Sequence, residues 1–173
     1  AVRDRGGERL RAEALHMPIS TDQEIAEHAD ALARRLLHPG RELHEVAPKP
    51  MLASTGTVEE GYDWAYEMKW DGYRVLAHLQ KKTVRLFSRS LLDYTKQYPA
   101  VVKALEAKEH DAIIDGEVVV INEKGIPDFD ALQSYKGQKG IVYYAFDLLW
   151  LDGYSLIDLP LTQRKKLLQS FLP

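Results

Sequence analysis

One stretch, residues 67–74, constrains the fold more than any other part of the chain; it reads Glu67-Met68-Lys69-Trp70-Asp71-Gly72-Tyr73-Arg74. Large apolar residues alternate with other residues upstream of it, which is typical of a β-strand; they are Trp64, Tyr66, Met68 and Trp70. Asp71-Gly72 predicts a tight turn, because glycine tolerates the backbone of a reversal. Val75, Ala77 and Leu79 predict a second strand. We therefore expect a hairpin with Lys69 at a strand end, facing a cleft.

A lysine is a nucleophile only when it is neutral, and burial beside other cations favours that form. Arg74 supplies a cation close in sequence, and the rings of Trp64, Tyr66 and Trp70 could enclose Lys69. The Asp71 carboxylate acts in the opposite direction unless a divalent metal neutralises it, so the stretch favours a bound metal. The alternative interpretation is a surface hairpin with an exposed lysine.

Composition limits the class of protein. The chain has 173 residues, of which 45% are hydrophobic and 28% charged, as expected for one globular domain. A net charge of −3 gives no general basic field, so any nucleic acid must meet a local patch. The chain has no cysteine, which excludes disulfides and thiolate chemistry. No apolar run is long enough to cross a membrane and no signal peptide is visible, so we expect a cytoplasmic protein with no membrane partner.

The sequence divides into two parts. Residues 1–48 predict an N-terminal extension with one amphipathic helix, which starts at capping boxes in residues 20–24 and stops at Pro39-Gly40. Residues 49–173 form the main domain. Because the chain starts at Ala1 rather than at a methionine, we expect it to be a piece of a longer protein.

Two acidic residues interrupt apolar strands of the main domain. Glu117 follows Asp115-Gly116 inside a β-branched run, where Gly116 allows a bulge or a close ligand. Asp147 follows Phe146 in the strand predicted over residues 141–150. An unpaired carboxylate in such a place is costly, so each needs a cation, a metal or a polar ligand.

Helices and turns complete the expected pattern. Val84, Leu86 and Ser88 predict a strand that follows a turn at Lys81-Lys82 and ends at Arg89. Helices are predicted from Pro99, from Pro127 and over residues 159–168.

These residues resemble a known set of motifs. Lys69-x-Asp71-Gly72-x-Arg74 is similar to motif I of the covalent nucleotidyltransferases, which are ATP-dependent DNA ligases, RNA ligases and mRNA capping enzymes. Further elements follow in the family's order: Ser88-Arg89, the motif III sequence Asp115-Gly116-Glu117, and the motif IIIa sequence of residues 146–153. The run from Pro50 to Ala53 also resembles the start of the ligase domain in bacterial end-joining ligases.

The resemblance implies an α+β fold with antiparallel or mixed sheets flanked by helices, as in the DNA ligase and capping enzyme fold, with its C-terminal part missing. It implies an ATP-dependent DNA ligase adenylation domain in which Lys69 is the nucleophile and carries AMP. ATP and Mg²⁺ or Mn²⁺ are the implied cofactors. DNA with nicks or broken ends is the implied partner, together with further domains or proteins of the end-joining pathway in the bacterial cytoplasm, at the nucleoid.

The resemblance also assigns residues to the nucleotide and the metal. Phe146 is expected to stack on adenine, and Glu67 to hold the adenine edge through its side chain or backbone. The expected nucleotide-binding set is Glu67, Met68, Arg74, Arg89, Glu117 and Phe146. The expected metal-binding residues are Asp71 and Glu117.

Two alternatives stay open. An RNA ligase or capping enzyme shares motif I, although the sequence of residues 146–153 argues against it. The second alternative is a truncated module that binds a nucleotide or a partner without catalysis. It stays open because the family's Glu-Gly and Lys-x-Lys motifs do not follow residue 150.

We expect the 173-residue chain alone to bind adenine nucleotides weakly and to adenylate itself very slowly or not at all. The family's late lysines balance triphosphate charge, and such contacts are stronger in the transition state than in the ground state. Mass spectrometry after incubation with ATP and magnesium measures this. Stoichiometric addition of AMP would show that the late motifs are dispensable.

Overall fold

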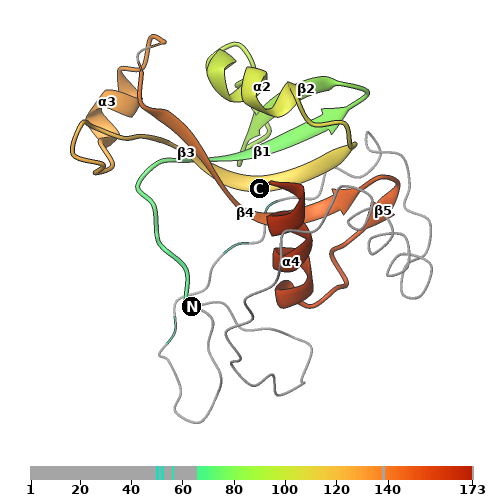
Figure 1. Ribbon diagram of the computed structural model, residues 1–173. Coiled ribbons are helices and arrows are strands. Elements are labelled where there is room, and N and C mark those ends of the chain that lie inside the picture. Colours follow the sequence, from blue (N-terminus) through green and yellow to red (C-terminus); the bar gives the residue numbers. More distant parts are fainter. Residues whose placement is uncertain (1–49, 51, 53–55, 57–65, 138, 173) are drawn as a thin grey trace.

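A computed structural model describes residues 50, 52, 56, 66–137 and 139–172 (Figure 1). The predicted extension of residues 1–48, its helix, its boundary with the main domain and Trp64 lie outside the described residues. No helix within the described part of the chain is long and apolar enough to span a membrane.

A five-stranded antiparallel sheet forms the centre of the fold, in the order β2-β1-β3-β4-β5. The strands are β1 (Tyr73–Gln80), β2 (Thr83–Ser88), β3 (Ala112–Val120), β4 (Ile141–Leu151) and β5 (Tyr154–Ser155). Figure 1 shows the long strands β3 and β4 curving side by side through the molecule. The expectation of an α+β fold with an antiparallel sheet is confirmed.

Three helices accompany the sheet: α2 (Pro99–Glu106), α3 (Phe129–Gln133) and α4 (Leu161–Phe171). As predicted, α2 has a proline in its first turn, and it buries Val101 and Leu105. The Asp128 side chain caps α3 by accepting a hydrogen bond from the Ala131 backbone N–H. All three helices contribute to one main core, together with β1 residues Val75, Ala77 and Leu79. Arg74 is on the opposite face of β1, away from this core.

The predicted strand that ends at Lys69 is wrong. Residues 66–70 have no regular secondary structure, Asp71 and Gly72 form a bend, and β1 begins at Tyr73. Of the alternating large residues in this part of the chain, Trp70 stacks on Tyr144 of β4 with ring centroids 3.8 Å apart, whereas Tyr66 and Met68 are exposed. The hairpin between β1 and β2 is as predicted, with Lys81 and Lys82 in its turn.

The register between β3 and β4 shifts twice, and the extra residues, Leu149 and Phe146, both lie on β4. The second shift is at Gly116, where the sequence predicts a bulge, but its extra residue is on β4 rather than on β3. Asp115 pairs with Asp147 and Gly116 pairs with Ala145, so Phe146 is the extra residue. Gly116 is needed for a different reason, because a Cβ there would lie 2.6 Å from the Tyr143 ring. The bulge sets Phe146 apart from the regular alternation of β4.

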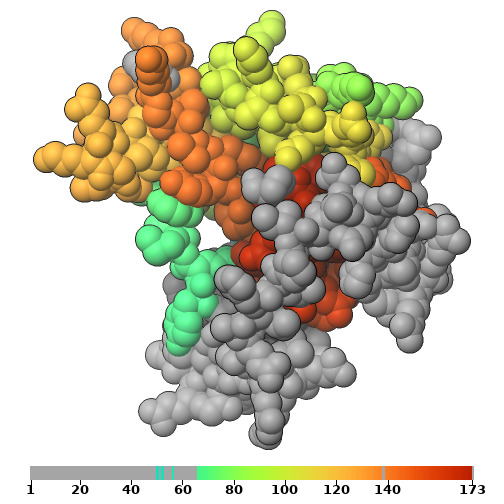
Figure 2. All heavy atoms as spheres, in the orientation of Figure 1, coloured from blue at the N-terminus to red at the C-terminus, as the bar shows by residue number. Residues whose placement is uncertain are grey.

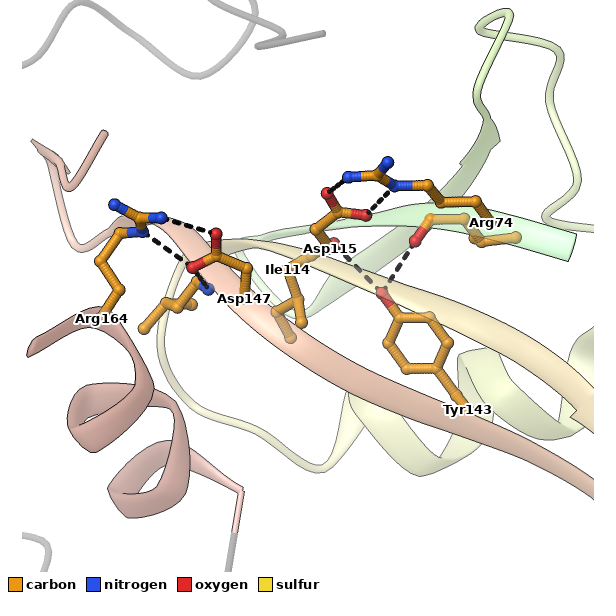
Figure 3. A network of polar contacts seen from close by, with 8 residues as sticks. Arg74, Ile114, Asp115, Tyr143, Asp147 and Arg164 are labelled. Carbon is orange, nitrogen blue, oxygen red and sulfur yellow. Dashed lines mark hydrogen bonds and ion pairs between the residues drawn. The ribbon is translucent and has the colours of Figure 1, made fainter. Parts of the chain in front are cut away.

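A buried ion pair joins α4 to β4 (Figure 3). Arg164 Nε donates to Asp147 Oδ1 at 2.8 Å, and its Nη2 donates to Asp147 Oδ2 at 2.9 Å. The two side chains are 7% and 9% exposed. The interpretation that Asp147 needs a partner is confirmed, but that partner is a helix arginine rather than a ligand.

We expect Arg164→Met to lower the free energy of unfolding by about 3–5 kcal/mol, because it leaves the Asp147 carboxylate buried and unpaired. Urea unfolding measures the change. Arg85→Met is the control, since Arg85 and Asp93 form an exposed pair that contributes little. Equal effects of the two substitutions would contradict the structural role of the buried pair.

Candidate functional site

Strand register gathers residues from distant parts of the sequence at one end of the sheet. Arg74 of β1 lies opposite Glu117 of β3, and Glu117 lies opposite Tyr144 of β4. Ser88, at the end of β2, pairs with Val75. The residues expected at the site from motif I and motif III therefore become neighbours because β1 and β3 are antiparallel.

Arg74 is held in a fixed orientation by Asp115 (Figure 3). Its Nε donates to Asp115 Oδ1 at 3.0 Å and its Nη2 donates to Oδ2 at 2.6 Å. The Asp115 side chain is 3% exposed, whereas that of Arg74 is 25% exposed. Burial raises the pKa of the Asp115 carboxyl, and the hydrogen bond and charge of Arg74 oppose that shift. The two hydrogen bonds to Asp115 hold the Arg74 guanidinium in place, while part of the Arg74 side chain stays exposed to solvent.

Phe146 meets the same arginine. The Arg74 guanidinium carbon lies 5.4 Å from the centroid of the Phe146 ring, which is cation–π geometry. The ring is partly buried. Asp115 thus orients the arginine, and the arginine in turn packs on the ring expected to stack on a base.

Glu117 connects the Lys69 segment to the sheet. The Gly72 backbone N–H donates to Glu117 Oε1 at 2.9 Å. Burial raises the pKa of Glu117, while the Gly72 hydrogen bond and the charges of Lys69 and Arg74 lower it. Asp71 acts on the same carboxyl and raises its pKa. The charges of Lys69, Asp71 and Arg74 therefore all act on one carboxylate.

Gly72 is required by a close approach of two backbones. A Cβ at this position would lie 2.2 Å from the Val118 carbonyl oxygen. The expectation that Gly72 serves a left-handed turn is wrong, because its φ lies outside the positive region in which glycine is favoured. The small residue brings the chain before β1 directly against β3.

Lys69 is exposed, as are the residues from Tyr66 to Met68, whereas Trp70 is half-buried. Figure 2 shows the green segment that precedes β1 at the surface. Tyr66 and Met68 are each 73% exposed, and Trp70 packs on Tyr144. The aromatic rings among the described residues therefore do not enclose Lys69. The expected apolar enclosure of this lysine is not found in this part of the chain. Glu67 forms an ion pair with Lys165 of α4.

Arg89 is exposed and lies in the turn that follows β2. Because Ser88 pairs with Val75, Arg89 is at the same end of the sheet as Arg74. The structure thus brings Lys69, Asp71, Arg74, Glu117 and Phe146 into one region, with Arg89 at its border.

Three residues with structural roles at the site were not assigned from the sequence. Asp115 lies in the Asp-Gly-Glu motif, and its place in an apolar strand was the available signal. Tyr143 directs its hydroxyl to the carbonyl oxygens of Val75 and Ile114, at 2.9 and 3.1 Å, and so supports both β1 and β3. The sequence around Lys165 does not indicate its role, because its partner Glu67 is far away in sequence.

The residues present fit a metal in a limited way. No group of three or more His, Cys, Asp or Glu side chains within the described ranges could hold a metal. Magnesium, however, commonly uses one or two carboxylates together with substrate phosphates and water. Asp71 and Glu117, whose charges interact, supply such a pair.

Comparisons with known proteins agree on one family. The family model described as the ATP dependent DNA ligase domain matches residues 50–173. The multifunctional non-homologous end joining DNA repair protein LigD of Mycobacterium tuberculosis is 41% identical over 124 residues, which is 70% of this chain and 16% of that protein. A DNA ligase of Natronomonas pharaonis is 38% identical over 140 residues, covering 72% of this chain and 26% of the relative.

Solved structures give the same result. A mycobacterial DNA ligase D complexed with ATP and MES matches with a TM-score of 0.66 and 39% identity, over 75% of this chain and 44% of that one. The ligase domain of M. tuberculosis LigD matches with a TM-score of 0.56 and 40% identity, over 60% of this chain and 35% of that one. The chain spans about a sixth of the LigD relatives' length.

We expect Gly72→Ala to lower the free energy of unfolding by roughly 1–3 kcal/mol, since the added Cβ forces the backbones of Gly72 and Val118 apart. Urea unfolding measures the change. Gly56→Ala is the matched control, because a Cβ there meets nothing within 4 Å. An unchanged midpoint for Gly72→Ala would mean that the approach to Val118 is not tight.

Proposed function

The chain belongs to the family of ATP-dependent DNA ligase domains, and on that premise we propose that it transfers AMP from ATP to Lys69 as the first step of DNA joining. The hydrogen bond from Gly72 to Glu117 carries the proposal. It ties the segment of the nucleophile to the strand of the ribose-binding carboxylate, two parts of the chain that are 45 residues apart.

The reaction is a substitution at the α-phosphorus of ATP. The neutral Lys69 Nζ attacks, a P–N bond forms, and the P–O bond to the leaving pyrophosphate breaks. The ammonium proton must leave before the attack, because a protonated amine has no free electron pair. Phosphoryl transfer of this kind depends on positioning and on neutralising phosphate charge.

The two arginines supply that charge from this chain. Arg74, oriented by Asp115, interacts with phosphate or ribose, and its fixed orientation means that little freedom is lost on binding. Arg89, exposed at the end of β2, contacts the phosphates or ribose from the border of the site. Asp71 and Glu117 would hold Mg²⁺ or Mn²⁺, which supplies charge stabilisation at the phosphates when bound.

The base and ribose are held by the other proposed residues. Phe146 stacks on adenine, since an aromatic ring binds a base through its face without demanding hydrogen bonds. Glu67 and Met68, which adjoin Lys69, contact the nucleotide, and Glu117 holds the ribose. The ATP in the complex of mycobacterial DNA ligase D supports adenosine triphosphate as the substrate.

DNA with nicks or broken ends is the proposed second substrate. The end-joining role is supported by the names of the LigD relatives, which are multifunctional end-joining proteins. For such a role we propose that the complete protein acts in the bacterial cytoplasm at the nucleoid, with further domains or proteins of the pathway as partners.

We predict that the complete protein carrying this domain forms a covalent AMP adduct on Lys69 when given ATP and magnesium. Lys69→Arg should abolish the adduct, because a guanidinium does not lose its proton at working pH. Mass spectrometry of the digested protein locates the modified residue. Lys96→Arg is the control, since Lys96 is exposed outside the proposed site.

Full labelling of Lys69→Arg would contradict the assignment of the nucleophile. Equal labelling of the wild-type protein by ATP and GTP would favour a capping-type enzyme instead. Nucleotide binding with no adduct would favour a module that binds without catalysis.

A further inference from the structure

Side chains on both sides of Lys69 attach its segment to the fold. Residues 66–70 have no helix or strand, so the hydrogen bonds of a regular element do not fix them. Glu67 forms an ion pair with Lys165 of α4, and Trp70 stacks on Tyr144 of β4 with ring planes 5° apart. Lys69 lies between these two attachments. Its direction therefore depends on both of them.

The helix that supplies Lys165 is a rigid base. The preceding residue, Arg164, forms the buried pair with Asp147 and also donates to the Leu159 carbonyl oxygen. Leu167, Leu168 and Phe171 of the same helix are buried in the main core. Figure 2 shows red atoms of α4 beside the green segment that precedes β1. A lysine on such a helix can hold a neighbouring segment in one place.

The ion pair also occupies the Glu67 carboxylate. Both side chains are 31% exposed, so the pair is partly shielded from water and is stronger than a fully solvated one. The ammonium group pairs with Oε1, so the amino group of adenine would meet Oε2 or would compete with a charged donor at Oε1.

We propose that Lys165 is a positioning residue for the nucleophile Lys69, and that it acts by holding the Glu67 side chain against α4. This role rests on the proposed function. In this proposal the segment of residues 66–70 is attached to the fold by an ion pair on one side of Lys69 and by an aromatic stack on the other. Helix α4 thereby has a part in the reaction, although no atom of Lys165 touches the reacting groups.

Cross-linking tests the pair independently of catalysis. The 173-residue chain has no cysteine, so Glu67→Cys/Lys165→Cys introduces two unique thiols. A short bifunctional thiol reagent should join them intramolecularly in high yield. Glu67→Cys/Lys166→Cys is the matched control, because Lys166 is exposed and belongs to the next position of the helix. Equal yields for the two pairs would overturn the proposed contact.

Adduct kinetics in the complete protein test the role. Lys165→Met should lower the maximal rate of Lys69–AMP formation by roughly ten- to a hundredfold, with little change in the ATP concentration for half-maximal rate. Lys166→Met should leave both values unchanged, and Lys165→Arg should restore most of the rate.

The outcomes separate the inference from the function. A loss of rate in Lys166→Met equal to that in Lys165→Met would overturn the inference, because Lys166 does not pair with Glu67. Wild-type rates in Lys165→Met would overturn it too. A wild-type protein with no adduct would overturn the proposed function, while the cross-linking yield would still report whether the pair exists.

Discussion

Two aspartates lie opposite one another on neighbouring strands in the interior of the sheet, and much of the site depends on how their charges are balanced. Asp115 of β3 pairs in register with Asp147 of β4, and burial, with a smaller contribution from the Asp147 charge, raises the pKa of the Asp115 carboxyl. Each accepts two hydrogen bonds from its own arginine, Arg74 from β1 and Arg164 from α4. Because each buried carboxylate needs a cationic partner, the first pair links β1 to β3 and the second pair links α4 to β4.

The same two ion pairs also position residues of the proposed site. Arg74 is directed at the surface because Asp115 binds two of its nitrogen atoms, and its guanidinium then lies near the Phe146 ring. Phe146 is the bulged residue next to Asp147, so the buried pair with Arg164 also steadies the ring. The nucleophile is different, because its segment has no regular structure and depends on side-chain attachments. The proposed site thus combines residues on the sheet, which hydrogen bonds and ring contacts hold in place, with a segment around Lys69 that has fewer attachments.

Local pattern was enough for much of the fold. Alternation predicted β1 and β2, the β-branched run predicted β3, and Pro99 marked the start of α2. The α+β fold of the covalent nucleotidyltransferases is confirmed by the match to LigD ligase domains. The strand predicted over Lys69 was wrong because residues 66–70 have no strand partner in the described structure, and Trp70 packs on a tyrosine that is distant in sequence. The partners of Asp147 and Glu67 could not be predicted, since nothing near either residue identifies an arginine or lysine on α4. The residue roles at the site stay predictions.

The turn between β1 and β2 has a consequence for engineering this domain. Lys81 and Lys82 both have positive φ, 48° and 63°, where two-residue hairpin turns favour Asn-Gly. Lysine is not suited to that backbone conformation. Residues that favour it, such as Asn-Gly, should therefore raise the free energy of unfolding. The turn lies at the Gln80–Thr83 end of the hairpin, away from the Val75–Ser88 end that borders Arg74. A designer could make the domain more robust there without altering the residues that meet the nucleotide.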